Sequence, residues 1–241
     1  AGSKVVISQV YGGGGNSGAT YKNDFIELYN PGADSVDLSG ASVQYASVTG
    51  TTWQVTNLTG KIGPGGYYLV QEAAGAAGTV SLPTPDATGS SAMGATAGKV
   101  ALVSSTTALT GSGCPFASSV IDFVGYGAAN CSESSPAPLL TNSTADIRKG
   151  GGLQDTNDNN ADFTSGAPNP RNTGSLPQAN PLTVVISPLT PGVEIGATVN
   201  FTATATMDGQ SVDITSATWS RPNPAAATID AATGVAHASA A

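Results

Sequence analysis

Short apolar runs separated by turn residues dominate the first half of the chain. The runs are rich in Val, Ile, Tyr and Phe, and no stretch keeps the spacing of an amphipathic helix. Segments such as Gly12–Gly15 and Gly63–Gly66 lie between them and permit tight turns. The pattern predicts an all-β fold, an antiparallel β-sandwich. The predicted strands are Lys4–Tyr11, Asp24–Asn30, Ala41–Val48, Thr51–Asn57, Gly66–Glu72, Lys99–Ser104 and Ser119–Tyr126.

A proline-rich segment divides the chain. Residues 166–181 hold four prolines and few apolar side chains, which favours a semi-rigid linker. The sequence therefore predicts a first domain at 1–172, a linker at 173–181 and a second domain at 182–241. The second domain is short for a sandwich, so we expect it to stop before its last strand and to leave an edge that a second copy could fill as a strand-swapped dimer. Its predicted strands are Leu182–Ile186, Thr198–Ala205 and Ala217–Ser220.

Composition narrows the class of protein. Charged residues make up 10% of the chain and the net charge is −8, which argues against a direct nucleic-acid surface because the chain lacks a basic patch. No apolar run approaches the roughly 18 to 20 residues that span a bilayer. The Ala-Gly-Ser start lacks the features of a signal sequence, so we expect a mature or trimmed chain.

The two cysteines, Cys114 and Cys131, lie in a stretch rich in Gly, Ser and Pro. We predict a disulfide, which would stabilise the fold by about 3 kcal/mol through loop closure in the unfolded chain. The alternative is a buried pair of free thiols. A zinc site needs more ligands than two cysteines, and the chain has a single histidine, His237.

Carboxylates and amides crowd together between Leu153 and Phe163. Oxygen donors at every second or third position suit Ca²⁺, which takes about six to eight oxygen ligands. The spacing does not match an EF-hand, so a bound Ca²⁺ would stiffen a loop. The alternative is a loop whose side chains cap its own backbone. The candidate metal ligands are Asp155, Asn157, Asp158, Asn160 and Asp162.

Two further acids, Glu27 and Asp122, fall on partly apolar faces of predicted strands. One interpretation is a paired-carboxylate hydrolase site, which requires the two groups to lie roughly 5 to 9.5 Å apart across one cleft. The other interpretation, which we favour, is that each acid accepts hydrogen bonds from turn amides or from a lysine such as Lys22. No catalytic residue is nominated, and we expect no enzyme activity. The aromatic residues are expected mainly to pack, with glycan stacking as the alternative.

Four stretches of the first domain resemble the lamin tail domain, an Ig-like module. The segment Phe25–Pro31, followed by Asp37–Gly40, is the most specific of them. Family members usually carry Trp after that glycine, whereas this chain has Ala41. The resemblance covers residues 4–172 and implies an Ig-like β-sandwich. The four stretches are Val5–Gly14, Asn23–Pro31 with Val36–Gly40, Gly66–Val70 and Val120–Gly127.

The second domain is similar to a bacterial Ig-like domain of group 2. Trp219 stands where that family has its core Trp, and the family's final strand lacks a counterpart, which agrees with an incomplete domain. The matching stretches are Pro191–Gly192, Gly196–Ala205, Ala217–Ser220, Ala227–Asp230 and Gly234–Ala238.

The two resemblances imply a location outside a bacterial cell or on its surface. The function expected is that of a non-catalytic structural or adhesive module, whose partners are other domains of the same polypeptide and, as an alternative, a glycan or extracellular polymer. Similar lamin tail domains often precede a secreted nuclease or phosphoesterase. The rival hypothesis is therefore a targeting module for such an enzyme, whose catalytic domain would lie outside this chain.

Overall fold

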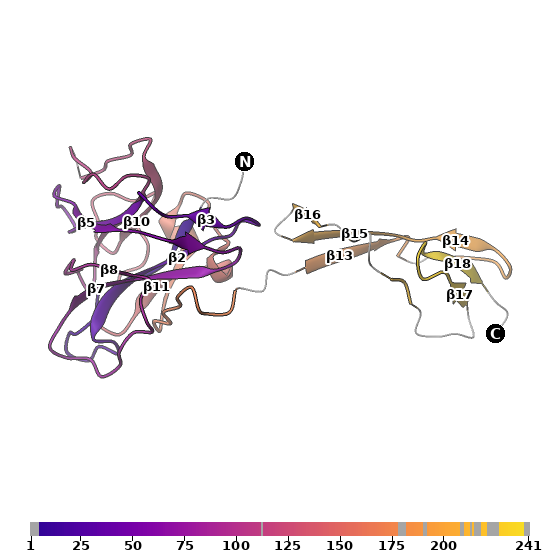
Figure 1. The fold of residues 1–241 in the computed structure, drawn as a ribbon, viewed down its shortest axis with the longest axis horizontal. Helices are drawn as coiled ribbons and strands as arrows, with labels where there is room; N and C mark the ends of the chain where they lie inside the picture. The colour runs from indigo at the N-terminus through magenta and orange to yellow at the C-terminus, as the bar shows by residue number, and fades with distance from the viewer. Residues whose placement is uncertain are drawn as a thin grey trace. The chain divides into compact units, whose positions relative to one another are not determined.

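The computed structural model of the chain forms two compact units, Ala1–Gln178 and Ala179–Ala241 (Figure 1). Each unit is described by itself. The structure describes residues 5–111, 113–177, 182–189, 192–207, 210–212, 214, 218–220 and 227–238.

The first unit is a sandwich of two β-sheets. The six-stranded sheet has the order β12-β11-β1-β2-β7-β8 and is antiparallel except at the β7–β8 pair. Its strands are β1 (Val6–Tyr11), β2 (Asn23–Tyr29), β7 (Tyr67–Ala74), β8 (Ala87–Thr88), β11 (Ala145–Arg148) and β12 (Phe163–Gly166). The four-stranded sheet has the order β10-β9-β4-β5, with β4 (Ser42–Ala46), β5 (Gln54–Asn57), β9 (Gly98–Val103) and β10 (Val120–Tyr126). A short ribbon pairs β3 (Val36–Asp37) with β6 (Lys61–Ile62).

The main hydrophobic core lies between these two sheets. Alternate side chains of each strand point into it, as the period of two in an extended chain requires. Ala41, where relatives carry Trp, belongs to this core together with Leu38 and Leu58. The six-stranded sheet contributes Val10, Ile26 and Val70 among others, and the four-stranded sheet contributes Val43, Val100 and Val124.

All seven strands predicted for the first domain are confirmed, as β1, β2, β4, β5, β7, β9 and β10. The prediction missed β11 and β12, which complete one edge of the six-stranded sheet. Strand β11 reads Ala-Asp-Ile-Arg; its two charged residues, Asp146 and Arg148, are buried, whereas its large apolar residue, Ile147, is partly exposed. Because the pattern of burial is the reverse of the usual one, a hydrophobicity pattern does not reveal this strand.

The second unit is also built from strands. One three-stranded sheet has the order β13-β15-β16, formed by β13 (Leu182–Ser187), β15 (Thr202–Met207) and β16 (Gln210–Val212). The other has the order β14-β18-β17, formed by β14 (Thr198–Asn200), β18 (Val235–Ala238) and β17 (Ala227–Ile229). The predicted strand at Leu182–Ile186 is confirmed, and the one at Thr198–Ala205 is divided into β14 and β15 at Phe201.

The predicted strand Ala217–Ser220 is wrong for the part that the structure describes. Residues 218–220 lie outside any strand, although the Trp219 amide donates a hydrogen bond to the Ala231 carbonyl. The Trp219 ring lies 6.2 Å from the ring of Phe201. Ala217 lies outside the described residues. The tryptophan therefore packs from an irregular segment.

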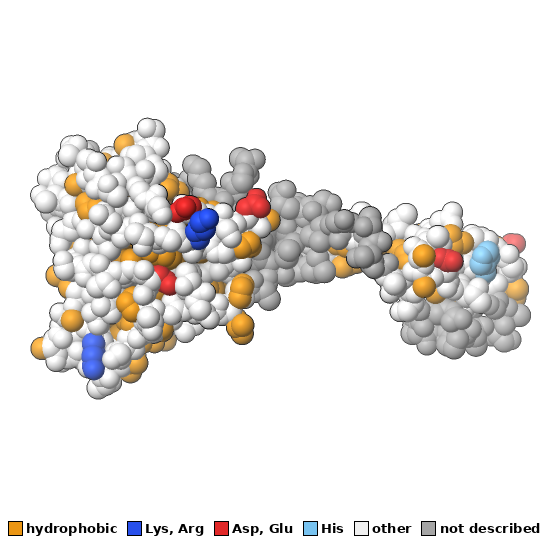
Figure 2. All heavy atoms as spheres, in the orientation of Figure 1, with side chains coloured by type: hydrophobic (Ala, Val, Ile, Leu, Met, Phe, Trp, Pro, Cys, Tyr) orange, Lys and Arg blue, Asp and Glu red, His pale blue; other side chains and the backbone are white. Residues whose placement is uncertain are grey.

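Charged side chains are sparse on the molecular face drawn in Figure 2. This agrees with the low share of charged residues, 10% of the chain. Within the described residues, no helix has the length and apolar character needed to cross a membrane. The two helical segments, η1 (Gly150–Gly152) and α1 (Asn159–Asp162), are short and lie between β11 and β12.

One buried acid in the sandwich has no hydrogen-bond partner among the described residues. Asp146 of β11 is 0% exposed and pairs with Val10 across the sheet, so its side chain shares the core-facing side. Both of its carboxylate oxygens lack a hydrogen bond. Burial raises the pKa of Asp146 to about 8. Asp146 is therefore protonated in the folded protein at neutral pH.

We expect the variant Asp146→Asn to gain stability over the natural protein as the pH rises. The pKa of an unfolded Asp is about 3.9, so between about pH 4 and 8 the folded state binds a proton that the unfolded state has lost. Stability from this group is fully present below pH 4 and falls as the pH rises to about 8. The difference in unfolding free energy between variant and natural protein should grow by roughly 2 to 5 kcal/mol from pH 4 to pH 8.5. Urea unfolding at both pH values measures it, and a constant difference contradicts the assignment.

Candidate functional site

The Asp- and Asn-rich segment connects β11 to β12 and includes α1. Asp158 caps α1, because its side chain accepts a hydrogen bond from the Asn160 amide. Asp162 accepts hydrogen bonds at 2.8 Å from both the amide and the hydroxyl of Thr156. Asn157 has a positive φ of 57°, a conformation that Asn tolerates better than most residues. Much of the segment's hydrogen bonding is therefore local.

Arg148 provides the positive charge beside this segment. The guanidinium is completely buried and forms ion pairs with Asp122 at 2.8 Å and with Asp155 at 3.2 Å. A third carboxylate, that of Asp162, lies 3.7 Å away. The same guanidinium donates to the Ile7 carbonyl at 2.7 Å and stacks over the ring of Phe163. This cluster of Arg148 and its acidic neighbours is called the Arg148 network below.

Two carboxylates of the Arg148 network, those of Asp122 and Asp155, lie close enough to the carboxylate of Glu133 for the three to share a cation. Oxygens of Asp122, Glu133 and Asp155 are all within 4.8 Å of each other. Burial, together with the neighbouring charges of Asp122 and Asp155, raises the pKa of Glu133 to about 8, against the opposite effect of Arg148. Burial likewise raises the pKa of Asp122. Protonation of Glu133 at neutral pH thus relieves the repulsion among these acids.

The five predicted metal ligands fall into two groups. Asp155 and Asp162 flank Arg148, as described above. Asp158 and Asn160 instead contact Ser135, through the Ser135 amide and carbonyl respectively, and the Asn157 carbonyl accepts from the Ser134 hydroxyl. The structure therefore does not gather the five around one point. Calcium binding by this segment stays a prediction.

Asn159 is an important residue that the sequence interpretation left out of the ligand set. Its side-chain amide pairs with the edge of β10, donating to the Phe123 carbonyl and accepting from the Gly125 amide, both at 2.9 Å. It also donates to Glu133 at 3.1 Å. A fully buried Asn between Asp158 and Asn160 carries no sequence signal of this role, because its partners on β10 lie 34 and 36 residues away.

Glu27 lies on the other face of the six-stranded sheet. Its carboxylate accepts hydrogen bonds from the Ser8 hydroxyl at 2.6 Å and from the side-chain amide of Gln9 at 3.2 Å. Arg171 forms a two-point ion pair with it, at 2.7 Å and 3.1 Å. The expected partner Lys22 is therefore wrong, since the cation comes from a residue 144 positions away.

The chain around Arg171 lies across the outer face of the six-stranded sheet. The Gln9 side chain donates to the Asn169 backbone carbonyl and accepts from the Asn169 backbone amide. It therefore pairs with this backbone as a neighbouring strand would. The Arg171 guanidinium lies 3.6 Å from the ring centre of Tyr67. Thr173 donates to Asp86 from both its amide and its hydroxyl. This segment, Asn169–Thr173, is called the strap below.

The paired-carboxylate hydrolase hypothesis is wrong for Glu27 and Asp122. Glu27 belongs to the six-stranded sheet and faces the strap, whereas Asp122 belongs to the four-stranded sheet and is paired with Arg148. The two carboxylates therefore do not meet across one cleft. Each is held by its own arginine, which agrees with the favoured interpretation that these acids have structural partners.

The tyrosines and Trp53 of the first domain, for which glycan stacking was the alternative to packing, are mostly inside the molecule. Tyr21 is half-buried, and the others are buried. Phe116, at 58% exposure, is an aromatic side chain at the surface, and its ring packs 5.2 Å from that of Phe123. The buried aromatic residues are Tyr11, Tyr29, Tyr45, Trp53, Tyr67, Tyr68 and Tyr126.

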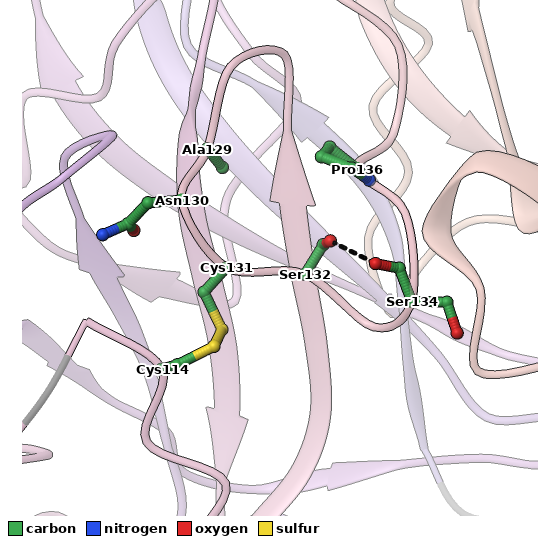
Figure 3. A pocket seen from close by; sticks show the side chains of 7 residues that line it. All are labelled: Cys114, Ala129, Asn130, Cys131, Ser132, Ser134 and Pro136. Carbon is green, nitrogen blue, oxygen red and sulfur yellow. Dashed lines mark hydrogen bonds between the residues drawn. A yellow bond between two sulfur atoms is a disulfide. The ribbon is translucent and has the colours of Figure 1, made fainter.

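The predicted disulfide between Cys114 and Cys131 is confirmed. It borders an open pocket of about 340 Å³, which is lined partly by hydroxyl and backbone groups (Figure 3). The Ser132 hydroxyl donates to the Ser134 carbonyl within it. The other lining residues are Ala129, Asn130 and Pro136.

These features define a class of protein: an Ig-like β-sandwich with a disulfide and with buried arginine–carboxylate pairs. A family model of the lamin tail domain matches residues 1–128. The match covers more than half of the 241 residues, and the chain belongs to the lamin tail domain family. The resemblance of the second domain to a group 2 bacterial Ig-like domain stays a prediction.

Other comparisons add little. A crystal structure of a DUF4876 family protein from Bacteroides thetaiotaomicron is similar, with 14% identity and a TM-score of 0.47. The similarity covers 73% of this chain and 75% of that one. No curated protein matches the chain.

We expect the variant Arg171→Met to destabilise the first unit by about 2 to 3 kcal/mol, because it leaves the fully buried Glu27 carboxylate without its cation. The loss should shrink in the Glu27→Gln background, where no charge remains to be paired. Urea unfolding followed by Trp53 fluorescence, in a Trp219→Phe background, isolates the first unit. Lys22→Met serves as the control and should unfold like the parent protein. Equal losses in both Glu27 backgrounds would contradict the ion pair.

Proposed function

We propose that this chain is an extracellular, non-catalytic module that gives mechanical and spatial support to neighbouring domains of a bacterial secreted or surface protein. The observation that carries the proposal is how the buried acids are paired: the carboxylates of Glu27 and Asp122, the best candidates for chemistry, each form an ion pair with an arginine of the fold. Groups held in this way stabilise a scaffold and are not free to transfer protons.

The disulfide supports the extracellular part of the proposal. Disulfides persist in oxidising surroundings and are rare in the cytosol of most organisms. The bond between Cys114 and Cys131 closes a loop with a sequence separation of 17, which contains β10, and so links the segments before and after that strand. A module exposed to proteases and shear outside a cell benefits from such a constraint.

The alternative function is that of a targeting module that binds a glycan or extracellular polymer for a secreted nuclease or phosphoesterase. The open pocket beside the disulfide and the exposed Phe116 ring favour it. A strand-swapped dimer is a further proposal for the second unit. Strand β13 lies at the edge of its sheet, and Val184 and Val185 are 51% and 56% exposed.

We expect the full chain to bind neither polysaccharides nor cell-wall fragments, and to hydrolyse neither phosphoesters nor glycosides. Biolayer interferometry with the immobilised chain, together with turnover assays on chromogenic substrates, tests this. If the chain bound a polymer and the variant Phe116→Ala lost this binding, the result would contradict the structural function and support the targeting function. Turnover that survives repurification would overturn both.

We infer that the Asp- and Asn-rich segment is a self-capped loop in which Arg148 offsets part of the negative charge. Thermal melts in millimolar Ca²⁺ and in EDTA should therefore superimpose, because a ligand of the folded state alone would raise the midpoint. A calcium-dependent rise that disappears in Asp155→Asn with Glu133→Gln would establish the calcium site instead. Asp37→Asn, which changes an exposed acid in the short ribbon, controls for general effects of charge.

A further inference from the structure

Lys99 is a buried lysine without a carboxylate partner. It lies on β9 with 0% exposure, and its neighbours in alternation, Ala101 and Val103, belong to the cluster on the outer side of the four-stranded sheet. In the described part of the chain its ammonium group forms no ion pair, and burial lowers its pKa. A buried charge of this kind needs acceptors that satisfy all three of its protons.

Three neutral oxygens supply those acceptors. The Lys99 ammonium donates to the Gly50 carbonyl at 2.8 Å, to the Gly113 carbonyl at 2.9 Å and to the Asn130 side-chain oxygen at 2.8 Å. The same ammonium lies 5.7 Å from the ring centre of Trp53. Three separate loops are thus joined at one nitrogen atom.

Two of these three acceptors directly precede the two cysteines. Gly113 comes immediately before Cys114, and Asn130 comes immediately before Cys131. In Figure 3 the Asn130 side chain points away from Pro136. The Asn130 amide also donates to the Val48 carbonyl, which fixes the backbone on this side.

We propose that Lys99 is the positioning residue for formation of the Cys114–Cys131 disulfide. By holding Gly113 and Asn130 together, its ammonium group keeps the two cysteines adjacent in the folded, reduced protein. It thereby raises their effective concentration toward each other, as any group that pre-orders two reactants does. The local positive charge also favours the thiolate, the form that attacks a disulfide.

The reaction is a thiol–disulfide exchange with an external disulfide as oxidant. With oxidised glutathione, one cysteine thiolate attacks a glutathione sulfur and releases one glutathione thiolate. The second cysteine thiolate then attacks the mixed disulfide and releases the other. Two cysteine thiols are oxidised, one oxidised glutathione becomes two reduced molecules, and both thiol protons end on glutathione.

The proposal is tested by equilibrating the reduced full chain in defined mixtures of reduced and oxidised glutathione. Acid quenching and mass spectrometry give the oxidised fraction and hence the effective concentration of the cysteine pair. Lys99→Met and Asn130→Ala should each lower it at least about tenfold, which is the lower end of the usual range for hydrogen bonds to a charged group. Asn130→Asp keeps the acceptor oxygen and should retain the natural value.

Val100→Ala is the matched control, because it shortens a core side chain on the same strand without touching the three acceptors. It should leave the effective concentration unchanged under conditions where circular dichroism shows every reduced protein folded. If Lys99→Met does not fold, the comparison of Asn130→Ala with Asn130→Asp decides alone, since Asn130 is an exposed residue. Equal values for these two variants, or an equal loss in Val100→Ala, would overturn the proposal.

Discussion

The buried ion pair between Arg148 and Asp122 ties the two sheets of the sandwich together. Arg148 comes from the edge region of the six-stranded sheet and Asp122 from the edge strand of the four-stranded sheet. Asp122 also accepts a hydrogen bond at 2.6 Å from the Ile7 amide, while Arg148 donates to the Ile7 carbonyl. The irregularity in the β1–β2 register between Ile7 and Gln9 thus lies beside groups that satisfy this backbone.

Burying this pair costs desolvation free energy, which is recovered only when every polar atom finds a partner. This requirement explains the composition of the segment that follows β11. Gln154 supplies a carbonyl to the guanidinium, and Asp155 and Asp162 add negative charge. Two members of the acid-rich run, Asp155 and Asp162, thus form part of the environment of a buried arginine.

The fold was more predictable from sequence than the site. Strands such as β1 and β9 alternate in the usual way or are buried on both faces, so their apolar residues reveal them. The sequence did not predict strand β11, because its charged residues Asp146 and Arg148 are the ones that point into the protein. The sequence did not predict the partner of Glu27 for a different reason. Arg171 lies in a proline-rich segment with the composition of a linker, and only folding brings this segment to the sheet. Long-range polar pairs of this kind leave no local pattern.

The family match ends at residue 128, but the structural unit does not. Strand β1 has β2 on one side and β11 on the other, with Gln9 opposite Ile147. Without residues 145–173, this side of β1 would be an unpaired edge, and both Asp122 and Glu27 would lose their arginines. Such a fragment would combine a free strand edge with two uncompensated buried charges, each of which destabilises a fold. The segment between the matched region and the second unit is therefore part of the sandwich itself, and its proline-rich end serves to hold Arg171 against the sheet before the chain continues.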